Sequence, residues 1–327
     1  MSMTPQAPFP DGWFAVAFSS DLRPGRVRRS RIAGSEVVVY RTRSGLVRVT
    51  DPHCPHLGAH LGHGGRVEGE RLVCPFHGFA FDADGTCVAT GYGTRPPRTA
   101  LRLRHSQEAN GFVFVWQHHA GLPPQWELPC LSDNAYPDTV ETSHCFRGHP
   151  DDPGENSVDL GHFAQVHRIT GARPVHALTT DLHRAELTVS GRKTFGRHGI
   201  GAEISYCYWG LGFTAIDTHI PRLRIRGRVL NAVTVTSPGQ LQMRTRISTA
   251  LDSGRADSRR APTNAPLWDR LLATVLTRAG QPQYLRDIRQ DIRIWHHKSY
   301  LERPRLAEGD GPITAWRRWT RQFYPTT

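Results

Sequence analysis

The chain has 327 residues, which predicts about two domains, each large enough to bury its own core. Hydrophobic residues make up 38% of it, and because no apolar run approaches the roughly 20 residues of a membrane helix, we expect no membrane span. The N-terminus lacks the basic and apolar regions of a secretory signal, so the sequence predicts a cytoplasmic protein.

The chain is strongly basic, with a net charge of +12 and 41 Lys and Arg residues, nearly all of them Arg. Such a balance would suit nucleic acid or an acidic protein partner. The basic residues are scattered, most densely over 23–31, and they form no helix-turn-helix, zinc-finger or RNP pattern. We therefore expect no nucleic-acid binding, and an acidic partner protein stays open.

The first part of the chain is rich in β-forming runs, at residues 13–18, 35–41, 46–50 and 111–116. These runs predict a small antiparallel β-domain over residues 1–120. Three prolines mark the crossing into a second domain, 121–327; they are Pro123, Pro124 and Pro129.

Two loops of this β-domain each carry one cysteine and one histidine: Cys54 with His56, and Cys74 with His77. Two Cys and two His can hold zinc, or a [2Fe–2S] cluster in which His replaces Cys on one iron. Structural zinc sites usually pair like residues at C-x₂₋₄-C and H-x₃₋₅-H spacing. The mixed loops therefore favour the cluster, with zinc as the alternative.

A second candidate site lies at residues 155–167, where His162 and His167 can each offer a neutral imidazole to a metal. Asn156, Asp159 and His162 would share one face of a helix, whereas His167 is rotated from His162 by roughly 140°. We therefore expect the helix to widen, bend or end between the two histidines. A carboxylate from elsewhere would complete the two-His, one-carboxylate set typical of non-haem Fe(II) sites. The alternative is that these residues merely occupy a partly buried helix.

The part from about residue 176 to 250 contains strand-like runs with short Gly- and Pro-bearing breaks, which predicts an antiparallel sheet. The expected strands are 185–189, 202–209, 214–220, 229–236 and 241–247. Four side chains on them are candidates for contacting a substrate and equally for core positions: Tyr206, Trp209, Phe213 and Ile216.

Helical segments are expected at about 266–277 and 281–298. The second segment carries Asp287 and Asp291, one turn apart on the same face, and either could supply the missing carboxylate. Spacing alone does not choose between them.

The two motifs, taken in this order, resemble those of Rieske non-haem iron oxygenases over nearly the whole chain. That family carries Cys-Pro-His and Cys-Pro-Phe-His loops, followed by an Asn-x-x-Asp-x-x-His-x-x-x-x-His segment, which residues 54–77 and 156–167 match. The resemblance implies an α+β protein, with an N-terminal all-β Rieske domain and a helix-grip catalytic domain built on an antiparallel sheet. It assigns a [2Fe–2S] cluster to the four loop residues and a mononuclear Fe(II) to His162, His167 and an aspartate.

Residues 290–298 resemble the Glu-Asp-x-x-Ile-Trp-x-x-Lys pattern of 3-ketosteroid 9α-hydroxylase oxygenase (alpha) components and cholesterol 7-desaturases, in which the Asp binds iron. Gln290 departs from the usual Glu, and the tail, 309–325, looks like the same subgroup. The similarity points to Asp291, not Asp287, as the third ligand. It implies a monooxygenase that uses O₂ to hydroxylate or desaturate a bulky apolar, steroid-like or polycyclic substrate.

Such an oxygenase would receive electrons from a ferredoxin or a flavin reductase, and so indirectly from NAD(P)H. Ala59 and Phe76 stand where high-potential Rieske proteins have a disulfide, which predicts a low-potential cluster suited to such donors. The family resemblance also implies a homotrimer and a catalytic role for Asp159 and Asn156. Asp159 would bridge a cluster histidine of one subunit to His162 of the next.

Two other functions stay open. Related sequences tailor natural products by oxidative cyclisation, demethylation or aromatic hydroxylation. Outside the oxygenases, the chain could be a Rieske electron carrier with an inactive second domain.

Overall fold

The computed structural model describes residues 9–131, 136, 139–195, 198–252 and 267–325. They fall into two compact units, which we describe separately. The N-terminal unit consists of Asp11–Cys130 with Thr234–Pro238, and the C-terminal unit chiefly of Leu131–Val233 and Gly239–Thr327. The predicted division at residue 120 lies inside the N-terminal unit and stays a prediction.

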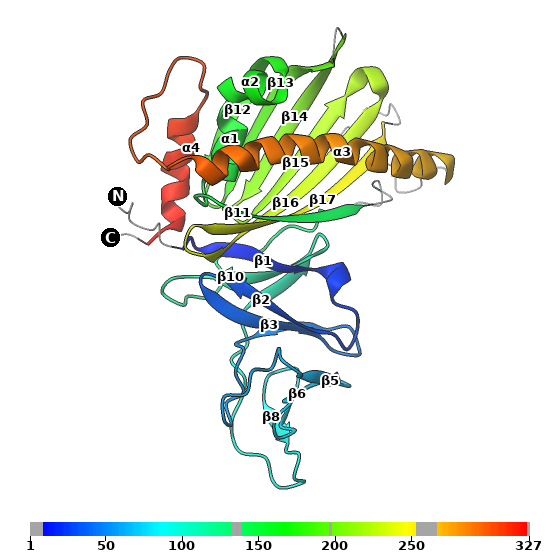
Figure 1. The fold of residues 1–327 in the computed structure, drawn as a ribbon, viewed down its shortest axis with the longest axis vertical. Coiled ribbons are helices and arrows are strands. Elements are labelled where there is room, and N and C mark those ends of the chain that lie inside the picture. Colours follow the sequence, from blue (N-terminus) through cyan, green and yellow to red (C-terminus); the bar gives the residue numbers. More distant parts are fainter. Residues whose placement is uncertain (1–8, 132–135, 137–138, 196–197, 253–266, 326–327) are drawn as a thin grey trace. The chain divides into compact units, whose positions relative to one another are not determined.

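Small antiparallel sheets build the N-terminal unit, and each contains strands that are neighbours in the sequence (Figure 1). One sheet has the order β1 (Gly12–Phe18), β10 (Phe112–Gln117) and β9 (Ser106–Ala109). The next has the order β2 (Val27–Ile32), β3 (Ser35–Arg41) and β4 (Val47–Thr50). The last has the order β5 (Arg66–Glu68), β6 (Arg71–Val73), β7 (Ala80–Phe81) and β8 (Cys87–Ala89).

The core of the N-terminal unit supports the two Cys-His loops. Leu61, Leu72 and Phe81 are fully buried and belong to the same apolar cluster as Cys54 and Cys74. Because packed cores deform little, the two cysteines are held on a rigid base.

The C-terminal unit is built on an antiparallel sheet, as the sequence predicts, but the sheet has seven strands and the sequence indicated five. Its order is β11 (Val140–Arg147), β17 (Gln240–Leu251), β16 (Ile225–Ser237), β15 (Phe213–Ile220), β14 (His198–Trp209), β13 (Arg184–Phe195) and β12 (Ile169–Asp181).

Helices cover one face of this sheet (Figure 1). They are α1 (Asp152–Val158), α2 (Gly161–His167), α3 (Leu267–His297) and α4 (Ile313–Thr320). The buried residues of α3 recur at helical spacing, so a single stripe of this helix faces β11 and β17; they are Ala273, Thr277, Ile288, Asp291 and Trp295.

Two expectations about these elements were wrong. α3 is one continuous helix, not two, and Pro282 lies inside it. A proline inside a helix lowers stability by about 3 kcal/mol, and packing of α3 on the sheet offsets this loss. The strand β12 was missed because most of its side chains are exposed and Pro174 interrupts its pattern. As an edge strand, β12 can hold a proline without losing a ladder bond.

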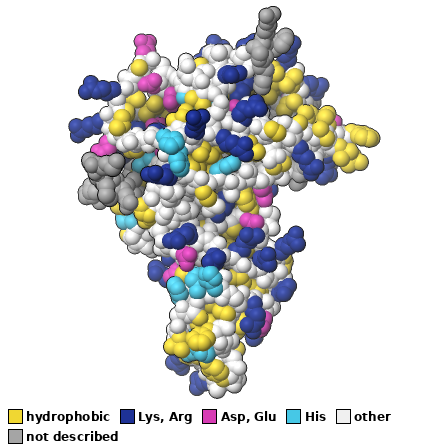
Figure 2. Space-filling model, viewed as in Figure 1, with side chains coloured by type: hydrophobic (Ala, Val, Ile, Leu, Met, Phe, Trp, Pro, Cys, Tyr) yellow, Lys and Arg dark blue, Asp and Glu magenta, His cyan; other side chains and the backbone are white. Residues whose placement is uncertain are grey.

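Two global properties bear on binding partners. In the part of the chain that the structure describes, no helix is long and apolar enough to cross a membrane. Figure 2 shows Lys and Arg side chains spread over the visible face instead of gathered in one patch, in line with the scattered charge of the sequence.

Candidate metal centres

The two Cys-His loops have the same backbone hydrogen bonds. In each loop the cysteine N–H donates to the carbonyl five residues later, at 2.9 Å for Cys54 and 2.8 Å for Cys74. The glycine four residues after each cysteine donates back to the cysteine carbonyl, at 2.9 Å for Gly58 and 3.2 Å for Gly78. Both glycines have positive φ, 75° and 66°, which lets the chain reverse. The loops are matching turns, each holding one Cys and one His.

The four side chains predicted to hold the cluster come together. The imidazoles of His56 and His77 lie with their ring centroids 4.9 Å apart, and the buried thiols of Cys54 and Cys74 are close enough to interact. Burial raises the pKa of the Cys54 thiol to about 11. Nδ1 of His77 is buried and has no hydrogen-bond partner among the described residues. An unpaired buried nitrogen beside a second imidazole and two buried thiols fits a [2Fe–2S] cluster held by two Cys and two His.

An apolar rim surrounds these loops. The ring of Phe79 stacks on His56, with centroids 4.1 Å apart. Leu57, Phe76 and Tyr92 stay largely exposed beside them. All six cysteines of the chain are unpaired, consistent with the absence of the loop disulfide.

Three other histidines of the N-terminal unit have partners of their own. His60 Nε2 lies 3.1 Å from a carboxylate oxygen of Glu36, and His63 Nε2 lies 2.7 Å from Arg29 Nη1. The ring of His53 packs edge-on against His60. These contacts occupy the rings and leave the four-residue group as the candidate for the cluster.

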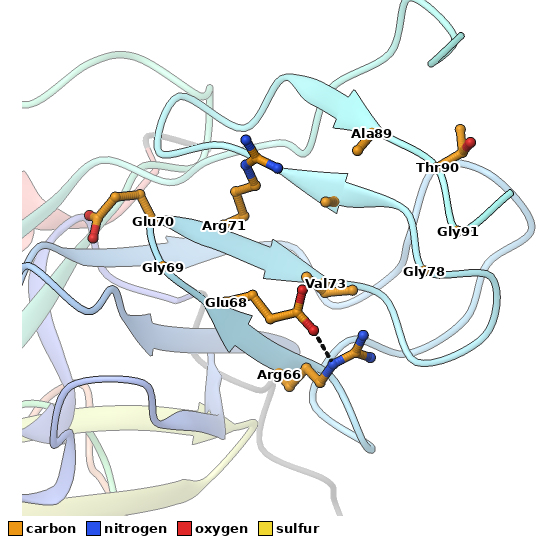
Figure 3. A pocket seen from close by; sticks show the side chains of 11 residues that line it. Arg66, Glu68, Gly69, Glu70, Arg71, Val73, Gly78, Ala89, Thr90 and Gly91 are labelled. Atoms are coloured by element: carbon orange, nitrogen blue, oxygen red, sulfur yellow. Dashed lines mark hydrogen bonds and ion pairs between the residues drawn. The ribbon is translucent and has the colours of Figure 1, made fainter. Parts of the chain in front are cut away.

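A pocket of about 530 Å³ lies next to the second loop, on the sheet formed by β5 to β8 (Figure 3). Arg66 and Glu68 form an ion pair of 2.6 Å on its wall. Its described lining contains no Cys or His. Gly78 belongs to the turn that carries His77, and Gly91 packs against that turn. The N–H of Gly91 donates to the His77 carbonyl at 3.0 Å. This surface supports the loop and offers neither thiol nor imidazole to a metal.

The C-terminal unit places His162 and His167 on one short helix, α2, with ring centroids 5.1 Å apart. The helix is continuous and neither widens nor ends between them, so those two expectations were wrong, and a bend stays a prediction. The chain leaves helical geometry earlier, at Asp159 (φ −78°, ψ 98°), and later, at Arg168 (φ 57°). His162 lies in the first turn of α2 and His167 is the last residue of this helix. No further turn of α2 lies beyond either residue, so the two rings can approach each other.

Asn156 and Asp159 both contact His162, although α1 has ended before α2 begins. His162 Nδ1 donates to the Asp159 carbonyl at 2.5 Å, which leaves Nε2 as the atom available to a metal. Asn156 Nδ2 donates to that Nε2 at 3.1 Å, so the lone pair that would bind a metal accepts a hydrogen bond in this structure. The Asp159 carboxylate accepts the N–H groups of Gly161 and His162, so it caps α2. Burial lowers the pKa of His162, which keeps the ring neutral as metal binding requires.

The two aspartates of α3 differ in their partners. Both oxygens of Asp287 accept hydrogen bonds from Lys193 Nζ, at 2.9 and 2.7 Å. Asp291 is buried, and its Oδ1 has no hydrogen-bond partner in the described structure. Oδ1 of Asp291 lies 3.1 Å from His167 Nε2, in ion-pair range but without the geometry of a hydrogen bond. The contacts therefore favour Asp291 as the ligand.

His162, His167 and Asp291 each offer one atom within 4.8 Å of the other two. A buried carboxylate oxygen that faces an imidazole nitrogen without hydrogen bonding to it costs free energy unless a cation satisfies both. Two imidazoles and one carboxylate on one side of a site are the donor set of non-haem Fe(II). The residues fit that metal.

A further group of metal-binding residues occurs in the N-terminal unit, at Asp11, His118 and His119. His119 donates to both oxygens of Asp11, from its backbone N–H and from Nδ1, each at 2.7 Å. His118 Nδ1 accepts the N–H of Ala120, so the proton of the neutral ring lies on Nε2. Hydrogen bonds explain this group without a metal.

The four predicted substrate residues divide between the two faces of the sheet. Tyr206 and Ile216 are paired across β14 and β15 and share the helix-covered face. Burial raises the pKa of Tyr206, and the charge of Asp291 adds a smaller increase. Trp209 and Phe213 form another pair, three residues along, and therefore lie on the opposite face. Substrate contact stays a prediction, and this placement favours Tyr206 and Ile216.

Sequence reasoning missed the residues that hold α1 in place. Arg317 donates to both oxygens of Glu155, at 2.5 and 3.0 Å, and Lys298 Nζ lies 2.8 Å from Asp152. One signal was available in the sequence, because Lys193 and Lys298 are its only lysines, and in the structure both contact acidic residues of the helices that cover the sheet.

Comparison with protein families gives two matches. Residues 12–98 match the Rieske [2Fe-2S] domain, and residues 115–324 match the 3-Ketosteroid 9alpha-hydroxylase C-terminal domain. Together they cover most of the chain.

Curated relatives are similar along the same span. The cholesterol 7-desaturase nvd 1 of Ciona intestinalis is 31% identical over 97% of this chain and 69% of its own length. The 3-ketosteroid-9-alpha-monooxygenase oxygenase component of Rhodococcus rhodochrous is 26% identical over 97% of this chain and 84% of its own length.

Solved structures share the fold. NdmA of Pseudomonas putida CBB5 with caffeine has a TM-score of 0.71 at 15% identity, covering 94% of this chain and 89% of that one. Dicamba monooxygenase bound to dicamba has a TM-score of 0.66 at 18% identity, covering 96% of each chain. At these identities the likeness concerns the fold alone.

Proposed function

This chain belongs to the Rieske oxygenases that carry the 3-ketosteroid 9alpha-hydroxylase type of catalytic domain, and from that premise we propose how its residues divide the work. It is an oxygenase component, a non-haem iron oxidoreductase with a Rieske [2Fe–2S] cluster and a mononuclear iron, and it uses O₂. When bound, the cluster supplies electrons one at a time, and the mononuclear Fe(II) activates O₂ for oxidation of a C–H bond.

Cys54 and Cys74 hold one iron of the cluster through their thiolates, and His56 and His77 hold the other through neutral imidazoles. Matching turns present the four side chains at one place on a rigid base. The unpaired Nδ1 of His77 supports this assignment.

His162, His167 and Asp291 hold the mononuclear iron and leave its other positions to O₂. The Asp159 carbonyl keeps the proton of His162 on Nδ1, so Nε2 faces the metal. The observation that carries the proposal is the buried contact of 3.1 Å between His167 Nε2 and Asp291 Oδ1, which no hydrogen bond explains in the described structure.

The substrate is a bulky, largely apolar molecule, steroid-like or polycyclic, that is hydroxylated or desaturated. The names of the similar relatives, a cholesterol desaturase and a 3-ketosteroid monooxygenase component, support this class. Tyr206 and Ile216, on the helix-covered face, supply apolar contact beside the iron site. The same apolar surface would exclude water from the site.

The electron donors are a ferredoxin, a flavin reductase or both, with NAD(P)H as the ultimate source. The active assembly is a homotrimer, in which Asp159 joins the cluster of one subunit to the iron of the next. A cytoplasmic location stays a prediction of the sequence.

The first prediction separates the two metal sites. Purified protein should be brown, Cys54→Ser should bleach it, and His162→Ala should keep the colour while losing the mononuclear iron and all product. Iron analysis, visible absorption and mass analysis of products from steroid and polycyclic panels, with O₂ and a surrogate reductase, check these outcomes.

Two results would contradict the proposal. A colourless protein with stoichiometric zinc would remove the cluster assignment. A brown protein that contains cluster iron alone would favour an electron carrier.

A further inference from the structure

The two aspartates of α3 approach opposite nitrogens of the same ring. Oδ1 of Asp291 lies 3.1 Å from His167 Nε2, and Oδ1 of Asp287 lies 3.9 Å from His167 Nδ1. If Nε2 binds the metal, the neutral ring must carry its proton on Nδ1. That nitrogen is buried and lacks a hydrogen-bond partner within the described part of the chain. The proton therefore needs an acceptor, and Asp287 offers one after a small shift.

The carboxylate of Asp287 is held in place from two elements. Lys193 Nζ, on β13, reaches both of its oxygens, and Gln283 Nε2, one turn earlier on α3, lies 2.9 Å from Oδ1. The side chains of Lys193 and Asp287 are only 18% and 28% exposed, so the pair is screened less than a surface ion pair.

The choice of lysine at this position is unusual for the chain. All but two of its 41 basic residues are Arg, so Lys193 departs from the pattern. A lysine carries a compact charge on a slender stem, whereas the planar fork of Arg needs more room. The site next to His167 calls for charge without bulk.

From these contacts we propose that Asp287 is a positioning residue for His167. Its carboxylate, held by Lys193, accepts the Nδ1 proton and so fixes the ring with Nε2 toward the metal. A carboxylate on the far nitrogen also makes the ring a stronger donor, and Lys193 limits that effect by neutralising part of the charge. The inference rests on the proposed function in one respect: His167 must bind a metal.

The test measures Co²⁺ affinity at the mononuclear site by competition with a chelator, in protein whose cluster is intact and whose mononuclear iron has been removed. Asp287→Ala should weaken Co²⁺ binding about 10- to 100-fold. Asp287→Asn, whose amide oxygen can still accept the proton, should recover part of that loss. Lys193→Met loses one of the two contacts that hold the acceptor but keeps Asp287 and its bond from Gln283, so the affinity should fall far less than in Asp287→Ala or not at all.

A purely structural ion pair between β13 and α3 predicts a different pattern. Lys193→Met and Asp287→Ala would then weaken Co²⁺ binding alike and lower the thermal midpoint alike. That result, or unchanged affinity in Asp287→Ala, would overturn the proposal. Since product formation is not measured, an error in the substrate class leaves the test intact, whereas wild-type protein that binds no Co²⁺ would count against the proposed function itself.

Discussion

His149 lies just before α1, is half-buried and stacks on Tyr300, with ring centroids 3.6 Å apart. Its Nδ1 accepts the N–H of Asp151 at 3.2 Å, a contact that only the deprotonated nitrogen can make. Burial lowers the pKa of His149 from 6.5 to about 4, outweighing the opposite effects of Asp152 and Glu155. The ring is therefore neutral in the folded protein at neutral pH.

This residue makes stability depend on pH. Between about pH 6.5 and pH 4 the unfolded chain binds a proton at His149 that the folded chain does not, so folding stability falls as the pH falls through this window. At the acid end of this window, the lowered pKa of His149 reduces the free energy of unfolding by about 3 kcal/mol. Thermal midpoints measured across this range should fall more steeply for the wild type than for His149→Gln, which keeps an acceptor but cannot titrate. Parallel curves for the two proteins would show that His149 does not govern this dependence.

At the scale of elements, α1 is held by the C-terminal segment of the chain. Asp151 accepts hydrogen bonds from the hydroxyls of Tyr300, Thr320 and Tyr324, at 3.1, 3.1 and 2.8 Å. Gly154 lies so close to α4 that a Cβ there would come within 2.1 Å of the Trp316 ring. Since α1 carries Asn156 and leads into α2, these contacts place the iron histidines.

Gly154→Ala tests this arrangement. Trp316 is fully buried, so the added methyl must displace it, and overpacking of this kind costs about 1–3 kcal/mol. We expect a lower thermal midpoint and reduced mononuclear iron, with the brown colour of the cluster retained.

The matched control is Gly280→Ala in α3, where a Cβ would meet nothing within 4 Å. This substitution should stabilise the protein by about 0.5–1 kcal/mol, because Ala is favoured over Gly inside a helix. If both substitutions act alike, close packing of α1 on Trp316 is not what positions the site.

At the scale of the whole molecule, the residues proposed to hold the cluster and those proposed to hold the iron belong to different compact units of the chain. Our proposal of a homotrimer makes electron transfer pass from one subunit to the next. Asp159 is suited to this role because its side chain is 31% exposed while its carbonyl holds His162.

Mixed assemblies test transfer between subunits. A Cys54→Ser chain and an Asp291→Ala chain should each be inactive, and should regain partial product formation when co-assembled, because an intact cluster can then face an intact iron. The same two chains purified as separate assemblies and then combined provide the control. Mixed assemblies that form but stay inactive would leave Asp159 with only the local role of capping α2.

Local pattern was enough to predict the family, the two cofactors and the α+β fold, and the comparisons confirm these predictions. The reason is that the informative features are short. Each Cys-His loop is a single turn, and the two candidate iron histidines lie on one helix. A strand is predicted from the alternation of apolar and polar residues over only a few positions.

The tertiary structure separates, by their contacts, residues that local spacing leaves equivalent, including the two aspartates between which the family resemblance alone had chosen. Asp287 and Asp291 share a face of α3, and they differ because Lys193, 94 residues away in sequence, pairs with one of them. Tyr206 and Trp209 both read as apolar strand residues, and the register of β14 puts them on opposite faces of the sheet. Long-range contacts of this kind leave no periodic trace in the sequence. For that reason the amino-acid sequence by itself determined which chemistry this protein carries, and the packing of distant segments decided which of several candidate side chains lie together in the proposed sites.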